Sequence, residues 1–207
     1  KLSYCKKKYG KFILILGDSH SVDLYNSISK ISKNNKFVIG LNKGGCRPSN
    51  KKDKCHYENS LKFIKKHNHH IMHIFFNQKG SYFLTNSGTI KDYSNSKFRK
   101  LPLNNEEIIS TINYLNSIKK INNKLTFVGP HIEPNIDLDI NSLNKYFKKK
   151  INFKDNSNYD LIVVDNELKN ISTQNEINYL SKIEILDFKF EKDFIVDGNF
   201  TFSDYDH

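Results

Sequence analysis

The stretch FILILGDSH, residues 12–20, decides the fold of this chain. Its first five residues form a continuous apolar run, which is typical of a strand buried on both faces of a parallel sheet. A Gly-Asp pair then breaks the run, and Ser19 stands where a helix is expected to begin, since serine is a preferred helix N-cap. Ligands of open parallel sheets bind at the carboxyl ends of the strands. The stretch therefore predicts a functional serine at that edge of a sheet.

Further apolar runs alternate along the chain with helix-like segments. The predicted strands after the first are residues 37–41, 71–76, 125–128 and 183–186. The predicted helices are residues 22–32, 57–66 and 104–121, the last with Ile108, Ile112, Leu115 and Ile118 at helical spacing behind an Asn cap. This alternation predicts an α/β fold: a three-layer α/β/α sandwich around a central, mostly parallel five-stranded sheet.

The region 135–182 fits this alternation less well. Leu161 to Val164 reads as a strand, but the neighbouring residues are polar and low in complexity. We interpret the region as an insertion or a helical cover. With 207 residues, the length is that of one domain with a sizeable core, and we assign residues 1–207 to a single domain.

A second motif, Asp204-Tyr205-Asp206-His207, closes the chain. A free serine hydroxyl is a poor nucleophile, and a neighbouring imidazole that accepts its proton activates it. Ser19 and an Asp-x-x-His pair at opposite ends of one domain are the components of such a triad. A surface turn for the second motif, and a helix cap for the first, are the alternatives.

The formal charge of +11 (33 basic minus 22 acidic residues) has little functional weight. Asn, Lys, Ile and Ser are abundant in a way that indicates an AT-rich genome, and the lysines are scattered. No stretch reaches the roughly 20 apolar residues of a membrane span, and no signal peptide opens the chain. Because the chain begins at Lys1 rather than Met, we expect it to be a piece of a longer protein.

The three cysteines are few but informatively placed. Cys46 and Cys55 flank a short, lysine-rich loop, which a crosslink would stabilise by roughly 2–3 kcal/mol in the chain-entropy model. Zinc binding is disfavoured because there is no Cys-x-x-Cys spacing. We predict a Cys46–Cys55 disulfide and an oxidising compartment, with Cys5 unpaired or bonded elsewhere; two unrelated thiols are the alternative.

Two other clusters were weighed for binding. The histidines at 67, 69, 70 and 73 have metal-like spacing, but strand alternation around His73 would scatter them, so we predict no metal site and no cofactor. The aromatic residues do not alternate with basic ones along a strand, which disfavours nucleic-acid binding. Tyr82 and Phe83, after the third strand, fit either stacking on a sugar ring or core packing.

With these motifs placed, the chain resembles the SGNH (GDSL-like) hydrolase superfamily, which is flavodoxin-like in fold. More narrowly, it resembles the SGNH domain fused to membrane-embedded acyltransferase-three domains of bacterial surface-polysaccharide O-acetyltransferases. The matching residues are 14–20, Gly45-Cys46-Arg47-Pro48 with Cys55, His131 after Val128-Gly129-Pro130, and 202–207.

The resemblance implies roles for individual residues. Ser19 is expected to be the nucleophile, His207 the general base and Asp204 the group that orients the imidazole. The oxyanion hole is expected to combine the Ser19 N–H with Gly45 or Gly44, and with Asn77 or, in its place, Gln78. The usual Gly-x-Asn block is absent around Asn77. For Asp18, bracing of the turn is expected rather than acid/base work.

The resemblance also implies a reaction and a location. We expect O-acetyl transfer to a sugar hydroxyl of a cell-envelope glycan such as lipopolysaccharide, capsule or peptidoglycan, with an acyl donor and a membrane acyltransferase domain in the same chain as partners. The expected location is the periplasmic or extracellular face of a bacterial membrane, with anchoring segments outside this fragment. A secreted carbohydrate acetyl esterase and a non-catalytic glycan-binding module are the alternatives.

Overall fold

A computed structural model describes residues 2–32, 36–50, 55, 57–85, 101–132, 160–187, 190–193, 195–196 and 199–200. Its central strands are β1 (Phe12–Gly17), β2 (Phe37–Asn42), β3 (Ile71–Asn77), β4 (Leu125–Val128) and β5 (Asn178–Leu180). The helices are α1 (Leu2–Tyr9), α2 (His20–Ile31), α3 (Tyr57–His67), α5 (Asn105–Ile121), α7 (Asp160–Gln174), α8 (Lys182–Leu186) and α9 (Phe190–Asp193). Short elements complete the description: the 3-10 helices η1 (Asn68–His70) and η2 (Gly80–Phe83), and the antiparallel pair β6 (Ile195–Val196) and β7 (Asn199–Phe200).

The five central strands form one sheet in the order β2-β1-β3-β4-β5, and every neighbouring pair in it is parallel. All the carboxyl ends therefore lie at one edge of the sheet. The register places Gly17 opposite both Asn42 and Asn77, and Asn77 opposite Val128. The predicted α/β architecture with a parallel five-stranded sheet is confirmed.

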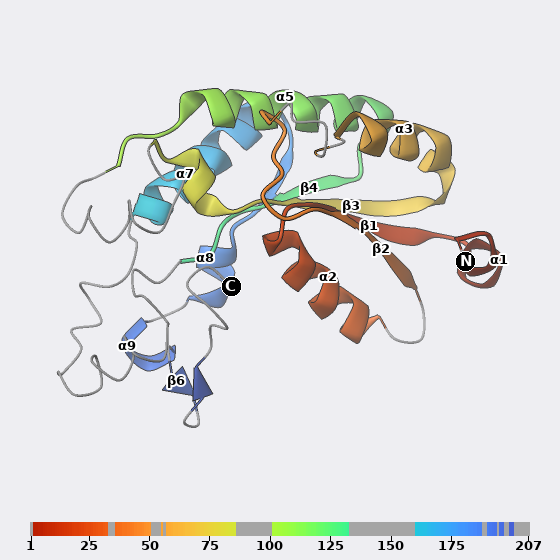
Figure 1. Ribbon diagram of the computed structural model, residues 1–207, viewed down its shortest axis with the longest axis horizontal. Coiled ribbons are helices and arrows are strands. Elements are labelled where there is room, and N and C mark those ends of the chain that lie inside the picture. The colour runs from red at the N-terminus through yellow and green to blue at the C-terminus, as the bar shows by residue number, and fades with distance from the viewer. Residues whose placement is uncertain are drawn as a thin grey trace.

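Helices cover the sheet on both faces, as predicted. Figure 1 shows α3, α5 and α7 on one face and α2 on the other. The apolar run of β1 is buried because both faces are covered: Phe12, Leu14, Ile15 and Leu16 are at most 1% exposed. The helical stripe predicted on α5 is also buried, from Ile108 to Ile118. All of these residues except Ile15 belong to one core cluster that runs from β1 to α7.

Two strand predictions were wrong. Residues 183–186 lie in helix α8 rather than a fifth strand, because Ser181 caps this helix by accepting a hydrogen bond from the Glu184 N–H at 3.0 Å. Residues 161–164 lie in α7, where Leu161, Val164 and Leu168 follow helical spacing and are fully buried. The fifth strand is the short, more polar β5 at the edge of the sheet.

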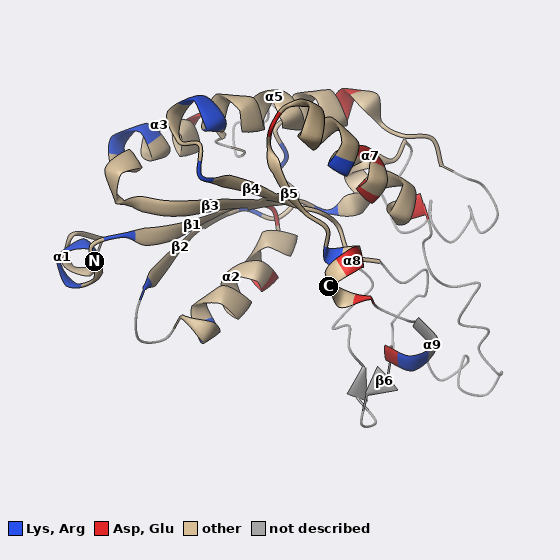
Figure 2. Cartoon of the chain, turned by 180° about the vertical axis from the view of Figure 1, so that it is seen from behind, with Lys and Arg blue, Asp and Glu red and all other residues tan. Residues whose placement is uncertain are grey.

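Among the helices that the structure describes, none is long and apolar enough to cross a membrane. Basic residues are spread over several elements of the described chain, including α1, α3 and α7, as Figure 2 shows. This distribution agrees with the scattered lysines of the sequence.

Candidate active site at the carboxyl edge of the sheet

Ser19 lies at the carboxyl edge of the sheet, between the end of β1 and the start of α2. It is the N-cap of α2 with φ −61° and ψ −36°, and it is partly exposed. Within the described part of the chain, the Ser19 N–H has no hydrogen-bond acceptor. The position offers a hydroxyl and an unused N–H at the positive end of a helix, which favours a developing oxyanion.

Gly17 is required by the close approach of β1 to β3. Its φ is +139°, and a Cβ atom built there would lie 1.8 Å from the backbone oxygen of Asn77. A larger residue would therefore collide with backbone, which cannot move away cheaply. The glycine allows the chain to leave β1 sharply and to present Ser19 at the sheet edge.

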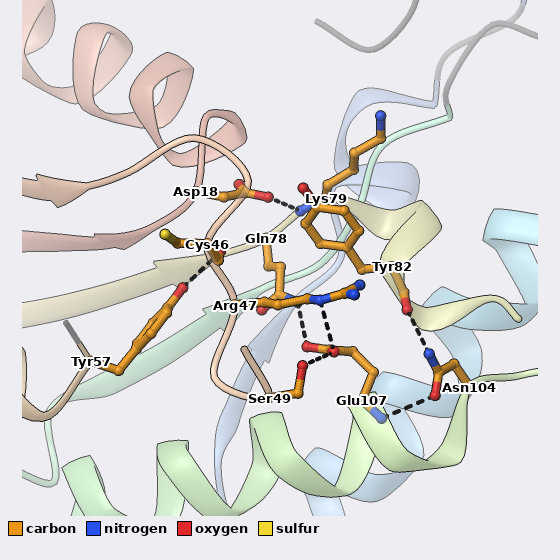
Figure 3. Close-up of polar contacts among 10 residues, drawn as sticks. All are labelled: Asp18, Cys46, Arg47, Ser49, Tyr57, Gln78, Lys79, Tyr82, Asn104 and Glu107. Atoms are coloured by element: carbon orange, nitrogen blue, oxygen red, sulfur yellow. Dashed lines mark hydrogen bonds and ion pairs between the residues drawn. The ribbon is translucent and has the colours of Figure 1, made fainter. Parts of the chain in front are cut away.

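Asp18 braces the same turn and is completely buried. Its Oδ1 accepts a hydrogen bond from the His20 N–H, and its Oδ2 accepts one from the Lys79 N–H, both at 3.0 Å. Burial raises the pKa of Asp18 to about 6, against the lowering effect of the two backbone donors. These contacts agree with the expected bracing role, because they tie the serine loop to the chain that follows β3 (Figure 3).

The second loop at this edge follows β2. The Lys43 N–H donates to the Gly17 carbonyl at 3.1 Å, which joins the ends of β1 and β2. Gly44 and Gly45 follow, both exposed, and Gly45 has a left-handed φ of +69°. Their N–H groups have no acceptor among the residues that the structure describes. Either N–H is available to a ligand at this edge.

The disulfide predicted between Cys46 and Cys55 is present, with the two Cα atoms 5.3 Å apart. Tyr57, at the start of α3, donates its hydroxyl proton to the Cys46 carbonyl at 3.0 Å. The loop after β2 is thus fixed at its base by a covalent bond and a hydrogen bond. A cavity of about 470 Å³ lies beside it, with Gly17 and Lys43 among its lining residues.

Asn77 is buried at the end of β3, but its amide points toward β4. Its Nδ2 donates to the carbonyl oxygens of Val128 at 2.9 Å and Gly129 at 3.4 Å, and its Oδ1 accepts from Lys182 Nζ at 3.2 Å. The amide of Gln78, the expected substitute, donates to Glu107 at 2.9 Å. Both amides therefore already have protein acceptors.

Glu107 forms a buried cluster that the sequence reasoning missed. Its side chain is only 2% exposed, accepts hydrogen bonds from Gln78 Nε2 and from the hydroxyl of Ser49, and forms an ion pair with Arg47 Nε at 3.4 Å. The backbone N–H of Glu107 donates to Asn104, the N-cap of α5. The one signal in the sequence is Asn104-x-x-Glu107, a capping-box spacing, and it predicts a helix start without predicting burial.

The histidines weighed as metal ligands have separate partners. His67 pairs with Lys6, His70 with the Gly10 carbonyl, and His73 with Thr126. No group of three His, Cys, Asp or Glu side chains in the described ranges is arranged to hold a metal ion. His131 lies close to His20, with ring centroids 5.3 Å apart.

The expected triad partners, Asp204 and His207, lie outside the residues that the structure describes, as does the last predicted motif as a whole. The structure therefore brings Ser19, Gly45 and Asn77 to one edge of the sheet and leaves the pairing of Ser19 with His207 as a prediction.

Comparison with known proteins identifies the family. The family model described as "SGNH domain (fused to AT3 domains)" matches residues 2–207, so this chain belongs to that family of SGNH domains. Membership places the chain in a class of hydrolases and acyltransferases whose members are fused to AT3 domains.

Two solved structures are similar to this chain. One is the periplasmic domain of a lipopolysaccharide acetyltransferase from Salmonella ser. Paratyphi A, with 20% identity and a TM-score of 0.61 over 87% of this chain and 69% of the other. The other is a putative platelet activating factor from Streptococcus pneumonia, with 11% identity and a TM-score of 0.44 over 95% and 83%. The first supports the fold. No curated protein sequence matches this chain significantly.

Proposed function

We propose that this protein is a serine-dependent O-acyltransferase that transfers an acetyl group to a sugar hydroxyl of a bacterial cell-envelope glycan. The observation that carries the proposal is the placement of Ser19, in a chain of this family, at the carboxyl edge of the parallel sheet and the start of α2. Lipopolysaccharide, capsule and peptidoglycan are the acceptor glycans that we consider.

The proposed reaction runs through an acyl-serine. Ser19 Oγ attacks the carbonyl carbon of the acyl donor while His207 accepts the hydroxyl proton and Asp204 orients the imidazole. Collapse of the tetrahedral intermediate leaves the acyl group on Ser19, and the proton passes from His207 to the leaving group. A sugar hydroxyl then gives its proton to His207 and attacks the acyl carbon, which restores the Ser19 hydroxyl.

The N–H groups of Ser19 and Gly45 are proposed as oxyanion donors, with Gly44 as the neighbouring candidate. Their lack of an acceptor within the described residues supports this role, since donors already in place need no reorganisation during the reaction. Asn77 is the third proposed donor. Its amide would first have to turn away from the Val128 carbonyl, and Gln78 would likewise have to leave Glu107.

The acyl group is proposed to come from a membrane-embedded acyltransferase domain of the same chain. The fusion to AT3 domains in this family supports that arrangement. We place the domain, residues 1–207, on the periplasmic or extracellular face of a bacterial membrane, which fits the Cys46–Cys55 disulfide because such bonds persist in oxidising compartments.

The test exposes the protein to a fluorophosphonate and to a chromogenic acetyl ester, with and without an oligosaccharide. We expect mass spectrometry to place the fluorophosphonate on Ser19, and acetylated sugar to form in addition to free acetate. Ser19→Ala should lower turnover by a factor on the order of 10⁴ or more while the melting temperature is retained. Turnover by Ser19→Ala within tenfold of the parent, or an adduct on another serine, would refute the assignment.

Product analysis separates the transferase from its alternative. If water replaces the sugar in the second step, only free acetate appears at every oligosaccharide concentration, and the protein is a carbohydrate acetyl esterase with the same triad. If neither product forms and no serine is labelled, the protein is a glycan-binding module.

A further inference from the structure

Arg47 has an orientation that is fixed on two sides. Its Nε lies 3.4 Å from Oε2 of the buried Glu107, and its guanidinium carbon lies 4.8 Å from the centre of the Tyr82 ring. Figure 3 shows the guanidinium between the Tyr82 ring and the Glu107 carboxylate. A planar guanidinium that is stacked on a ring and anchored through one nitrogen has lost most of its freedom before any ligand arrives.

The same contacts leave the binding edge of the guanidinium unused. Arginine has five N–H donors, and within the described structure the one contact of Arg47 with a carboxylate is the ion pair of its Nε with Glu107. The side chain is 35% exposed, so solvent reaches it. Its four terminal donors therefore form a fork that matches a carboxylate or phosphate, which bind such a fork through two parallel hydrogen bonds.

Glu107 offsets the charge of Arg47 in an ion pair. The carboxylate also accepts hydrogen bonds from Ser49 and Gln78, which share its negative charge. The other described carboxylate of this cluster, Asp18, is buried and is bound by two backbone N–H groups. The terminal nitrogens of Arg47 are therefore the charged donors of this cluster that solvent reaches.

Three lysines bring formal positive charge to the same edge of the sheet. Lys43 directly follows β2, Lys79 follows β3 by two residues, and Lys182 follows β5 by two residues. Each therefore lies at the edge where Ser19 and Arg47 stand. An anionic ligand would be attracted to this edge before it meets the fork of Arg47.

The choice of arginine is itself informative in this sequence. Only two of the 33 basic residues are arginines, Arg47 and Arg99. The other 31 basic residues are lysines. A planar fork stacked on an aromatic ring is what lysine cannot supply.

We propose that Arg47 binds an anionic group, a carboxylate or a phosphate, of an acidic glycan acceptor next to Ser19. This subsite adds a ligand-binding residue to the proposed function. The identification of its ligand as the glycan acceptor rests on that function. Arg47 would orient the sugar through its charged substituent and so select acidic glycans over neutral ones.

The test measures binding, which needs no turnover. An oligosaccharide of uronic acids, its carboxyl-reduced neutral counterpart and a phosphorylated neutral oligosaccharide of the same length are titrated calorimetrically at low salt. The proteins are the parent, Arg47→Lys, Arg47→Gln and Lys62→Gln. Arg47→Lys keeps a positive charge near Glu107 but loses the fork, and Lys62 is an exposed residue of α3 that serves as the matched loss of one charge. Circular dichroism and melting temperature establish that each variant is folded.

We expect the parent to bind one or both anionic oligosaccharides at least tenfold more tightly than the neutral one, and the two anionic arms to identify carboxylate or phosphate. Arg47→Lys should reduce this preference about tenfold, since charge-assisted bidentate bonds contribute about that much or more. Lys62→Gln should retain it within about twofold.

A parent without preference for either anionic oligosaccharide, or a preference that survives in Arg47→Lys, would overturn the proposal. If Arg47→Gln does not fold, Arg47→Lys alone decides. Turnover of the neutral chromogenic ester by the parent is scored separately. A parent that binds acidic glycan but never turns over the ester refutes the proposed reaction and keeps the anionic subsite.

Discussion

Replacement of Glu107 by leucine should destabilise the protein strongly, although Glu107 is a charged residue on a helix. The buried carboxylate accepts hydrogen bonds from Ser49 and Gln78 and pairs with Arg47. Leucine has a similar size but offers no acceptor. Ser49 and Arg47 are partly exposed and can turn to water, whereas Gln78 is 1% exposed and its Nε2 would be left without a partner.

The expected cost follows from these contacts. One stranded buried donor costs about 1–3 kcal/mol, and the lost charge-assisted bonds add about 1.5–3 kcal/mol, so we expect about 2.5–6 kcal/mol in total. For a domain of this size that corresponds to a fall in melting temperature of roughly 5–24 °C. Glu107→Gln should cost less, about 1–2 kcal/mol, because its carbonyl still accepts, and Gln78 can turn its unpartnered Oε1 toward the new amide.

Urea unfolding followed by circular dichroism measures both variants. The control is Glu106→Gln, which removes an exposed carboxylate from the same turn of α5 and should change the free energy of unfolding by less than about 0.5 kcal/mol. If Glu107→Leu unfolds at the same urea concentration as Glu106→Gln, the buried cluster does not hold this part of the fold together, and the reasoning fails.

Three further predictions concern the same edge of the sheet. Reduction of the Cys46–Cys55 bond should cost roughly 2–3 kcal/mol of stability, seen as a lower melting temperature with reductant, and both residues as free thiols in protein from an oxidising compartment would contradict the bond. Asp204→Asn should cut ester turnover by orders of magnitude and Asp206→Asn by less than about tenfold; the reverse order would assign the orienting role to Asp206. Because burial raises the pKa of Asp18 from 3.8 to about 6, the folded state holds this proton more tightly than the unfolded chain, so stability falls as the pH rises from about 4 to about 6. Urea titrations should show a loss on the order of 3 kcal/mol over that range that is missing in Asp18→Asn, and parallel pH profiles of the two proteins would refute it.

The sequence predicted the parts of the fold that depend on local pattern. The strands at residues 12–16, 37–41, 71–76 and 125–128 are confirmed as β1 to β4, and the three predicted helices agree with α2, α3 and α5 to within two residues. Continuous apolar runs bounded by polar residues are enough where a parallel strand is buried on both faces.

The sequence-based predictions of secondary structure were wrong where the apolar runs were short. Residues 161–164 and 183–186 each contain a few consecutive or alternating apolar side chains, which fit a strand and a helix equally well. The outcome is decided by context: a cap at Ser181 starts α8, and burial of Leu161, Val164 and Leu168 along one stripe requires a helix. The edge strand β5 is only three residues long and begins with a polar residue, so its sequence carries little signal for a strand.

The candidate site also has parts that the sequence predicts and parts that it does not. The position of Ser19 and the cysteine pair were predictable because each rests on a short motif, whereas the environment of Glu107 joins residues 29 to 60 positions apart. No spacing in the sequence indicates that Arg47 and Ser49 meet Glu107, because the contact arises only when the loop after β2 lies over the start of α5. The orientation of Asn77 is equally a product of packing, since its amide is satisfied by the end of β4.

The two buried carboxylates explain how loops without regular structure can hold a site in place. Asp18 ties the serine loop to the backbone of Lys79, and Glu107 ties the loop after β2 to the side chain of Gln78. These two anchor residues are adjacent and directly follow β3, a central strand with neighbours on both sides. The loop with Ser19 and the loop with the glycines proposed as oxyanion donors are therefore both held against the end of β3. A backbone hydrogen bond from the Lys43 N–H to the Gly17 carbonyl also joins the two loops directly. Since β3 is a central strand with side chains in the core, the spacing of the two loops is set by a buried element of the sheet, which is what an acyl-transfer site requires of its donors.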